Sequence, residues 1–489
     1  MLATVVMQND AQRRLIDAVH ARFGTRSAIT DPDAISPWLI DWRGRFHGEA
    51  SAILAPADLD ATAAIVGMAH ELGVALVPQG GNTSMVGGAT PPADGSALIL
   101  SLRRMNRVRS IDPAAGVAIA EAGVILSVLH EAAEAQAMRF PLTLGAKGSA
   151  TIGGLVSTNA GGTQVLRWGT MRKLVAGVEA VLPNGSLHDG LAALKKDNRG
   201  YDIDQLLIGA EGTIGIVTAA ALRMAPAIAA RAAAWVGVAS PHRALDLLRF
   251  FERCTQAVES FEIIPTSGLA HVLAHIPDTR APLAGHHPWH LLVEAVASNP
   301  DDEPPAALLE RLLAEAHGAG LIEDATVSTS EAQAEAFWRI RDSLSEAERA
   351  QGPAVQHDIS VPVERMPDFL IDAAAAAMAR YPGTHATGFG HLGDGNVHFH
   401  VRAPGGVDRD AWYANEAPGI TRFVHDMVVA AGGSISAEHG IGQMKRDELA
   451  RLGPPSRLAA LAAIKRAFDP SNLMNPGKLV TLAPSARDQ

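Results

Sequence analysis

Pro78-Gln-Gly-Gly-Asn-Thr-Ser84 follows directly on a short apolar run, Ala75-Leu-Val-Pro78, and two more glycine-rich stretches come after it, at 145–162 and 209–215. Glycine permits positive φ and close backbone approach, so successive N–H groups can converge on an anion. Interleaved Asn, Thr and Ser residues supply further donors. One such loop alone is most simply a tight turn, but three in succession favour binding of a pyrophosphate.

Two common nucleotide-binding signatures are absent from the sequence. No G-x-G-x-x-G opens a helix after a strand with an acidic residue about twenty positions later. No G-x-x-x-x-G-K-[ST] phosphate loop occurs either. A nicotinamide cofactor held in the usual way is therefore disfavoured.

Length, composition and charge set the broad class. The chain of 489 residues is 47% hydrophobic and 19% charged, which indicates a globular protein of two or three domains. The formal net charge of −11 argues against nucleic acid or an anionic membrane as a partner. A single cysteine, Cys254, excludes a disulfide framework, a cysteine-based zinc site and an iron–sulfur cluster. Residues 1–7 do not resemble a signal peptide, and no apolar run approaches the roughly 20 residues of a membrane span. We expect a soluble, cytoplasmic protein.

The pattern of the chain changes near residue 226. From about 50 to 225 short apolar strands, glycine loops and helices alternate, and Asn184-Gly185 separates two apolar runs as in a β-hairpin. Beyond Pro226 glycine becomes less frequent and longer helical patterns occur, at about 243–256, 304–318, 331–350, 364–380 and 409–430. We place a domain boundary there and expect mixed α+β structure.

A second group of chemically capable residues lies in the C-terminal half, where Gly390-His-Leu-Gly-Asp-Gly-Asn-Val-His-Phe-His400 precedes Ser436-Ala-Glu-His-Gly440. The two histidines that flank the Gly-Asp-Gly turn, with Glu438, are ligand types for a metal such as zinc and leave room for a substrate. Adjacent residues on extended backbone point to opposite sides, so we expect one ligand and one free base from Glu438 and His439. The alternative is a glycine-rich turn with surface histidines.

Seven motifs in this order resemble those of the FAD-linked D-2-hydroxyacid dehydrogenases, which include D-lactate, D-2-hydroxyglutarate and glycolate dehydrogenase relatives. The motifs run from about residue 48 to the C-terminus, at 78–84, 145–162, 209–217, 357–362, 390–400, 438–442 and 475–478. The resemblance implies an α+β fold, with a two-part FAD-binding domain of the vanillyl-alcohol-oxidase type and an α/β cap domain built on an antiparallel sheet. The domains it implies are an N-terminal segment packing on the FAD domain (1–47), the FAD-binding domain (48–226), a substrate-binding cap (227–440) and a C-terminal segment returning to the FAD domain (441–489).

The resemblance also implies FAD contacts from the glycine loops and their neighbours. The expected residues are Pro78, Gly80, Gly81, Asn82, Thr83, Ser84, Gly87, Pro141, Gly145, Gly148, Ser149, Gly153, Asn159, Gly161, Gly162, Gly212, Ile216 and Asn475. Flavoproteins of this type that bind FAD covalently generally use a histidine or cysteine near the flavin ring. The loop 78–88 contains neither, so we expect non-covalent FAD.

By the same resemblance, a divalent metal, commonly zinc, is expected on His391, His398 and Glu438, with His439 as the catalytic base. The 2-hydroxy acid would lose its hydroxyl proton to His439 with help from the metal, and its C2 hydride would pass to flavin N5. The substrate contacts implied are Arg341, Ser345, Gln356, His400 and His439. Arg341 and Ser345 are four apart and so should share a helix face. A salt bridge from Arg341 to Glu335 or Glu346 is the alternative.

Two departures from the family pattern bear on the substrate. D-2-hydroxyglutarate dehydrogenases typically carry lysine where this chain has Gln356 and asparagine where it has His400. A buried second carboxylate needs a positive partner, because an unpaired buried charge is costly. We therefore expect a D-lactate-like monoacid, with D-2-hydroxyglutarate or D-malate as the alternative.

Other classes of function stay open at this point. The His/Glu group could serve a metal-dependent hydrolase acting on a nucleotide-like substrate, or the chain could be a non-catalytic flavin- or nucleotide-binding module. The sequence has no haem-binding C-x-x-C-H motif and no iron–sulfur cysteines. The electrons of a dehydrogenase would pass to a separate acceptor, which could be an electron-transfer flavoprotein, a quinone or a cytochrome. A homodimer is expected by analogy.

Overall fold

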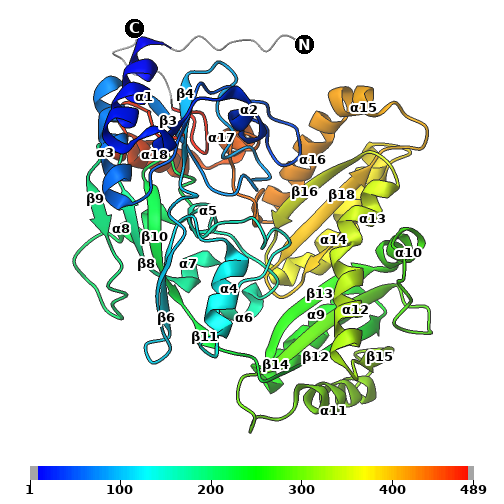
Figure 1. Cartoon of the computed structure of the whole chain (residues 1–489). Coiled ribbons are helices and arrows are strands. Elements are labelled where there is room, and N and C mark those ends of the chain that lie inside the picture. Colours follow the sequence, from blue (N-terminus) through cyan, green and yellow to red (C-terminus); the bar gives the residue numbers. More distant parts are fainter. Residues whose placement is uncertain (1–8, 483–489) are drawn as a thin grey trace. The chain divides into compact units, whose positions relative to one another are not determined.

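The computed structural model describes residues 9–482, and these fall into two compact units. The first comprises the described parts of Met1–Ala160, Thr170–Pro226 and Glu438–Gln489, and the second comprises Gly161–Gly169 and Ala227–Ala437 (Figure 1). Residues 1–7, for which no signal peptide is expected, lie outside the described range. Among residues 9–482, no helix combines the length and the apolar character that crossing a membrane requires.

Two sheets form the framework of the first unit. The first has the order β1-β2-β4-β3, in which β2, β4 and β3 run parallel and β1 pairs antiparallel with β2. The second, β5-β6-β10-β8-β9, is antiparallel throughout. Its β8 and β9 pair from Val181 to Leu187 across the Asn184-Gly185 turn, as the hairpin signal predicts. The strands are β1 (Ala28–Ile29), β2 (Ile53–Leu54), β3 (Ala75–Gln79), β4 (Ala97–Ser101), β5 (Val108–Asp112), β6 (Val117–Glu121), β8 (Val175–Val181), β9 (Leu187–Asp189) and β10 (Ile216–Arg223), and a small pair β7 (Met138–Arg139) and β11 (Ala225–Pro226) lies apart.

Helices of the first unit pack against the parallel sheet. Apolar side chains of α1 and α3, such as Leu15 and Ile65, form one core with the strand residues Leu76 and Leu98. The helices are α1 (Asp10–Phe23), α2 (Pro32–Ile35), α3 (Leu59–Leu72), α4 (Leu126–Glu134), α5 (Ile152–Thr158), α7 (Met171–Leu174), α8 (Ile203–Leu207), α17 (Arg446–Leu452) and α18 (Pro455–Phe468).

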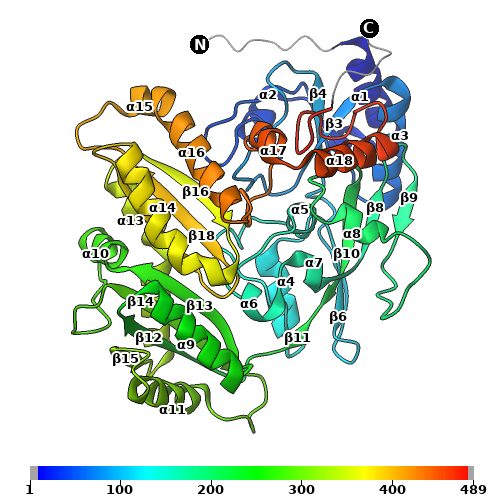
Figure 2. The ribbon, with the colours of Figure 1, turned by 180° about the vertical axis from the view of Figure 1, so that it is seen from behind.

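A seven-stranded sheet with the order β15-β12-β14-β13-β17-β18-β16 organises the second unit (Figure 2). Every pairing in it is antiparallel, which confirms the antiparallel sheet expected after Pro226. The strands are β12 (Ala230–Val238), β13 (Val258–Pro265), β14 (Trp289–Ala297), β15 (Asp324–Val327), β16 (Ala354–Ser360), β17 (His385–His391) and β18 (Asn396–Arg402).

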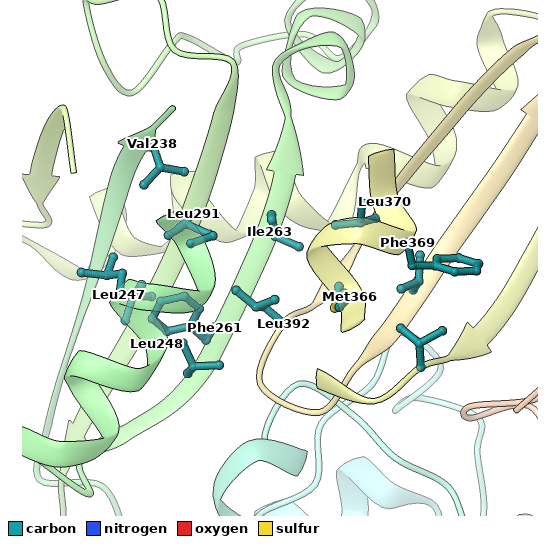
Figure 3. Packing of buried hydrophobic residues seen from close by; sticks show 14 of the residues in the cluster. Val238, Leu247, Leu248, Phe261, Ile263, Leu291, Met366, Phe369, Leu370 and Leu392 are labelled. Atoms are coloured by element: carbon teal, nitrogen blue, oxygen red, sulfur yellow. The ribbon is translucent and has the colours of Figure 1, made fainter. Parts of the chain in front are cut away.

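Helices bury both faces of this sheet. One face packs on α9 (Pro241–Cys254), α11 (Pro305–Gly318), α14 (Met366–Arg380) and α16 (Ala417–Ala430). Figure 3 shows part of that core, with Val238, Leu247, Leu248, Phe261, Ile263, Leu291, Met366, Phe369, Leu370 and Leu392. The other face packs on α10 (Thr266–His275), α12 (Glu331–Asp342) and α13 (Leu344–Ala350). The remaining α-helices are α6 (Val165–Trp168) and α15 (Arg409–Asn415), and η3 (Val363–Arg365) is a 3-10 helix. Side chains alternate along a strand, so the residues between those of the first core face α12 and α13. Several of these residues are polar, among them Glu262 and His391.

Candidate active site

The first two glycine loops of the first unit approach each other closely. A Cβ atom at Gly81 would collide with the carbonyl oxygen of Ser149, and one at Gly80 would collide with the Thr151 hydroxyl. The backbone of the loop after β3 therefore lies directly against the loop that leads into α5, and a side chain at Gly81 would displace the Ser149 carbonyl. Gly145 and Gly148, by contrast, have open space where a side chain would stand.

The third loop and the C-terminal segment join the same region. Asn475 donates its side-chain N–H to the carbonyls of Gly88 (2.9 Å) and Glu211 (2.7 Å), so it connects the loops after β3 and before β10. Within the described residues, the buried Asn475 Oδ1 and Thr151 Oγ1 have no hydrogen-bond partner. Buried polar atoms normally have a partner, so these two atoms and the glycine-lined space fit a polar cofactor such as FAD.

The other expected FAD contacts lie in both units. Most belong to the first unit: Pro78 packs on Gly212, Asn159 caps the C-terminus of α5, and Ile216 begins β10. Gly161 and Gly162 belong to the short segment that is part of the second unit.

A histidine pair lies on the polar face of the second unit's sheet. His391 ends β17 and His398 lies on β18, where they are diagonal neighbours on one face with ring centroids 5.5 Å apart. Asp358 on β16 is opposite His398, and Glu262 on β13 is opposite His391. The strand register thus brings four metal-capable side chains onto adjacent strands.

Glu262 connects the histidine pair to Arg341. Its Oε1 lies 2.6 Å from His391 Nδ1, and its Oε2 accepts a hydrogen bond of 2.8 Å from Arg341 Nε. A carboxylate that accepts the Nδ1–H of a histidine fixes the tautomer with the lone pair on Nε2, the arrangement found behind metal-ligating histidines. Arg341 therefore pairs with Glu262.

Burial and charge keep His398 neutral. Burial, with the nearby positive charge of Arg341, holds the pKa of the His398 imidazole well below its usual value. Burial by itself would raise the pKa of Glu262, but Arg341 and His391 outweigh it and the pKa of that carboxyl is lowered. A neutral imidazole and an ionised carboxylate are the protonation states that metal ligation and its supporting shell need. The residues present in this unit fit a divalent metal.

The expected third ligand and the expected base belong to the first unit, since Glu438 is the first residue of its last segment. Both are half-buried, and the chain bends over Ala437, Glu438 and His439. The backbone at Glu438 and His439 is therefore not extended, and the expected divergence of their side chains does not follow from strand alternation. The division of roles between Glu438 and His439 stays a prediction.

The expected substrate residues of the second unit line the same sheet face and the helices that cover it. His400 lies two residues beyond His398 on β18 and opposite Gln356 on β16, so the face predicted for His400 is confirmed. Arg341 and Ser345 do not share one helix, because α12 ends at Asp342 and α13 begins at Leu344. Ser343 lies between the two helices, and this corrects the expected single helix.

Sequence reasoning missed Glu262 and Asp358 as members of the site. Glu262 is 1% exposed within the otherwise apolar run Phe261-Glu-Ile-Ile-Pro265, and a charge inside such a run was a usable signal. Asp358 follows His357 in a stretch that already matched the family pattern.

Comparison with protein families agrees with this geometry. A model for the FAD binding domain matches residues 50–190, and a model for the C-terminal domain of FAD linked oxidases matches residues 228–479. A D-2-hydroxyglutarate dehydrogenase from Xanthomonas citri pv. viticola is 35% identical over 92% of this chain and 93% of its own length. This chain belongs to the FAD-linked D-2-hydroxyacid dehydrogenases. The mitochondrial D-2-hydroxyglutarate dehydrogenase of Bos taurus is also 35% identical, over 92% of this dehydrogenase and 81% of the bovine protein.

Solved structures establish the fold class of the dehydrogenase. p-Cresol methylhydroxylase superposes with a TM-score of 0.73 at 15% identity, covering 96% of this chain and 97% of that one. The fold is that of the vanillyl-alcohol-oxidase type of flavoprotein, as predicted, and the enzyme is an FAD-linked oxidoreductase that acts on D-2-hydroxy acids.

The expectation of a cytoplasmic protein is wrong. The relatives from Bos taurus, Arabidopsis thaliana and Danio rerio, 33–35% identical to this dehydrogenase, are all named as mitochondrial proteins. The expectation relied on a single cysteine and on the absence of a signal peptide. Neither feature distinguishes one reducing compartment from another.

Proposed function

We propose that the enzyme oxidises a D-2-hydroxy monoacid to the 2-oxo acid, with His391, His398 and Glu438 as metal ligands and His439 as the base. The observation that carries this proposal is the pair of buried His391 and half-buried His398, supported by Glu262 and next to Arg341. The substrate hydroxyl loses its proton and C2 loses a hydride. Electrons then leave to a separate acceptor, for which an electron-transfer flavoprotein, a quinone and a cytochrome are candidates.

Each protein group has a defined task in this scheme. FAD, when bound, supplies the hydride acceptor, and a divalent metal, when bound, lowers the pKa of the substrate hydroxyl. His439 takes the hydroxyl proton on an imidazole nitrogen, the side-chain group most often used as a general base. The Arg341 guanidinium offers two parallel N–H groups to the substrate carboxylate, which orients C2. Gln356, Ser345 and His400 contact the substituent on C2.

The residues around the C2 substituent favour a monoacid. Gln356 and His400 face each other across β16 and β18 and offer hydrogen bonds without a fixed charge. Arg402 is two residues further along the same face of β18, and its Nη1 lies 3.8 Å from Oε2 of Glu348, which is 1% exposed. A second substrate carboxylate would have to compete with Glu348 for that arginine. D-2-Hydroxyglutarate is the second candidate, because the curated relatives at 33–35% identity carry that name.

A panel of substrates separates these two candidates. We expect kcat/KM for D-lactate and D-2-hydroxybutyrate to exceed that for D-malate and D-2-hydroxyglutarate, measured by anaerobic bleaching of the flavin. L-Lactate serves as the stereochemical control. A tenfold preference for either diacid, about 1.4 kcal/mol in transition-state binding, would show that the charge argument misses a compensating residue.

The flavin should be released when the protein unfolds. The loop 78–88 has no histidine or cysteine, and Cys254 is an exposed residue of the second unit. Acid or heat denaturation followed by centrifugation should leave the yellow colour, absorbing near 450 nm, in the supernatant. Colour that stays with the precipitate would demonstrate a covalent link and contradict the prediction.

A further inference from the structure

Glu211 makes an unusual pair of contacts in the first unit. It stands in the loop Gly209-Ala-Glu-Gly212 before β10 and is 8% exposed. Its Oε1 accepts the backbone N–H of Ile441 and its Oε2 accepts that of Gly442, each at 2.7 Å. One carboxylate thus holds two successive peptide groups of the segment that begins two residues after His439.

Glu211 is itself held firmly in place. Its backbone N–H donates to Ser157 at the end of α5 (2.8 Å), and its carbonyl accepts from Asn475 (2.7 Å). Its φ of +53° lies in the left-handed region, which a glutamate adopts only when its surroundings impose it. The Glu211 carboxylate therefore has a defined position, from which it binds the backbone at Ile441 and Gly442.

Further backbone contacts hold the segment on the C-terminal side of the bend. The N–H groups of Gln443 and Met444 both reach the carbonyl of Val86 at 3.2 Å. Gly440, with φ of +80°, faces the Glu211 carboxylate so closely that a Cβ would lie 2.9 Å from Oε1. The chain is thus held from Ile441 onward, and the Glu211 carboxylate lies against Gly440, the residue that follows His439.

Charge alone does not explain this arrangement. Burial raises the pKa of Glu211, while the hydrogen bonds from Ile441 and Gly442 and the charges of Lys445 and Lys478 act in the opposite direction. Burial, with the charge of Arg446, in turn lowers the pKa of Lys478 to about 8. Burying the Glu211 carboxylate is costly, and its two oxygens accept hydrogen bonds from two backbone N–H groups. These hydrogen bonds hold the backbone of the segment in place.

We propose that Glu211 is a positioning residue for the catalytic base: its carboxylate orients the bend that carries His439. This rests on the proposed role of His439. A misplacement of about 1 Å at a reacting group can lower turnover by about a hundredfold, so a contact that directs the bend would affect kcat without touching substrate.

The test is Glu211→Gln in the FAD-loaded enzyme, with Glu179→Gln as the matched control. Glutamine has one acceptor oxygen, so one of the two N–H groups would face the amide NH₂. We expect kcat to fall by about 10- to 100-fold, with KM and FAD content within about threefold. Amide hydrogen exchange at Ile441 and Gly442 should accelerate. Glu179, equally buried and held by Arg109 (2.8 Å), should lower the melting temperature when changed but leave kcat intact.

Amide exchange and turnover test the role of Glu211 and the proposed function separately. Rapid exchange at Ile441 and Gly442 in the unaltered enzyme would remove the structural basis, and an unchanged kcat in Glu211→Gln would remove the catalytic role. If Glu211→Gln does not fold, Gly440→Ala disturbs the same contact from the other side and should give the same loss of kcat. An unaltered enzyme that oxidises no 2-hydroxy acid would contradict the proposed function, while the exchange result would still decide whether Glu211 holds the bend.

Discussion

Replacing His439 by alanine should lower kcat by about 10²- to 10⁴-fold, the usual contribution of a general base, while FAD and metal stay bound. Replacing His391, His398 or Glu438 by alanine should abolish turnover and also remove the metal, because a site with three protein ligands rarely survives the loss of one. Metal analysis, flavin absorbance and single-turnover flavin bleaching of the four variants give three independent readings. If the Glu438 variant keeps its metal and the His439 variant loses it, the two roles are reversed.

His242→Ala is a suitable control for these four variants. His242 is an exposed residue of α9 that pairs with Asp368 at 2.8 Å, far along the chain from the motif residues. Its replacement should change neither metal content nor turnover. Loss of metal from this variant would show that the metal bound to surface histidines and not to the proposed ligands.

The local part of this site was readable from the sequence, because strand alternation needs no long-range information. His398 and His400 are two residues apart, and β18 places them on one face as expected. The same reasoning failed at Glu438 and His439, where the chain bends. A short stretch without flanking strand signals does not reveal whether it is extended, so the premise could not be checked from sequence.

Helix ends were predicted unevenly for a similar reason. The pattern at 409–430 divides into α15 and α16, and Pro418 in the first turn of α16 explains the break, since proline cannot continue a helix from the preceding turn. That signal was present in the sequence. The break at Ser343 was not readable, because Phe337, Ile340, Leu344 and Ala347 keep helical spacing across it and all face one core.

The partner of the histidine pair depends on sheet register, which no local pattern encodes. Glu262 and His391 are 129 residues apart in sequence and meet only because β13 pairs with β17. Arg341, 79 residues from Glu262, arrives on a helix that packs over the same face. The sequence motif identified His391 and His398, but only the tertiary structure shows that the Glu262 carboxylate supports them.

The shared role of Glu262 means that Arg341 has two functions, which one substitution would confuse. Arg341 is 12% exposed at its side chain and Glu262 is 1% exposed, so their ion pair is buried. Removing one partner of a buried pair leaves an uncompensated charge and typically costs about 3–5 kcal/mol of stability. Loss of activity in an Arg341 variant could therefore reflect unfolding instead of lost substrate binding.

A double-mutant cycle separates these two functions. Arg341→Met should lower the free energy of unfolding by about 3–5 kcal/mol and lower kcat/KM by about 10²-fold or more, since the substrate carboxylate loses a bidentate partner worth several kcal/mol. Adding Glu262→Gln should restore most of the stability, because a neutral amide at that position needs no cation. Since Glu262 also supports His391, kcat/KM of the double variant is compared with that of Glu262→Gln alone, and it should be about 10²-fold lower. Arg311→Met, which breaks an exposed pair with Glu303, controls for loss of an arginine and should change neither quantity appreciably. Equal kcat/KM in the double variant and in Glu262→Gln alone would show that Arg341 serves the fold and not the substrate.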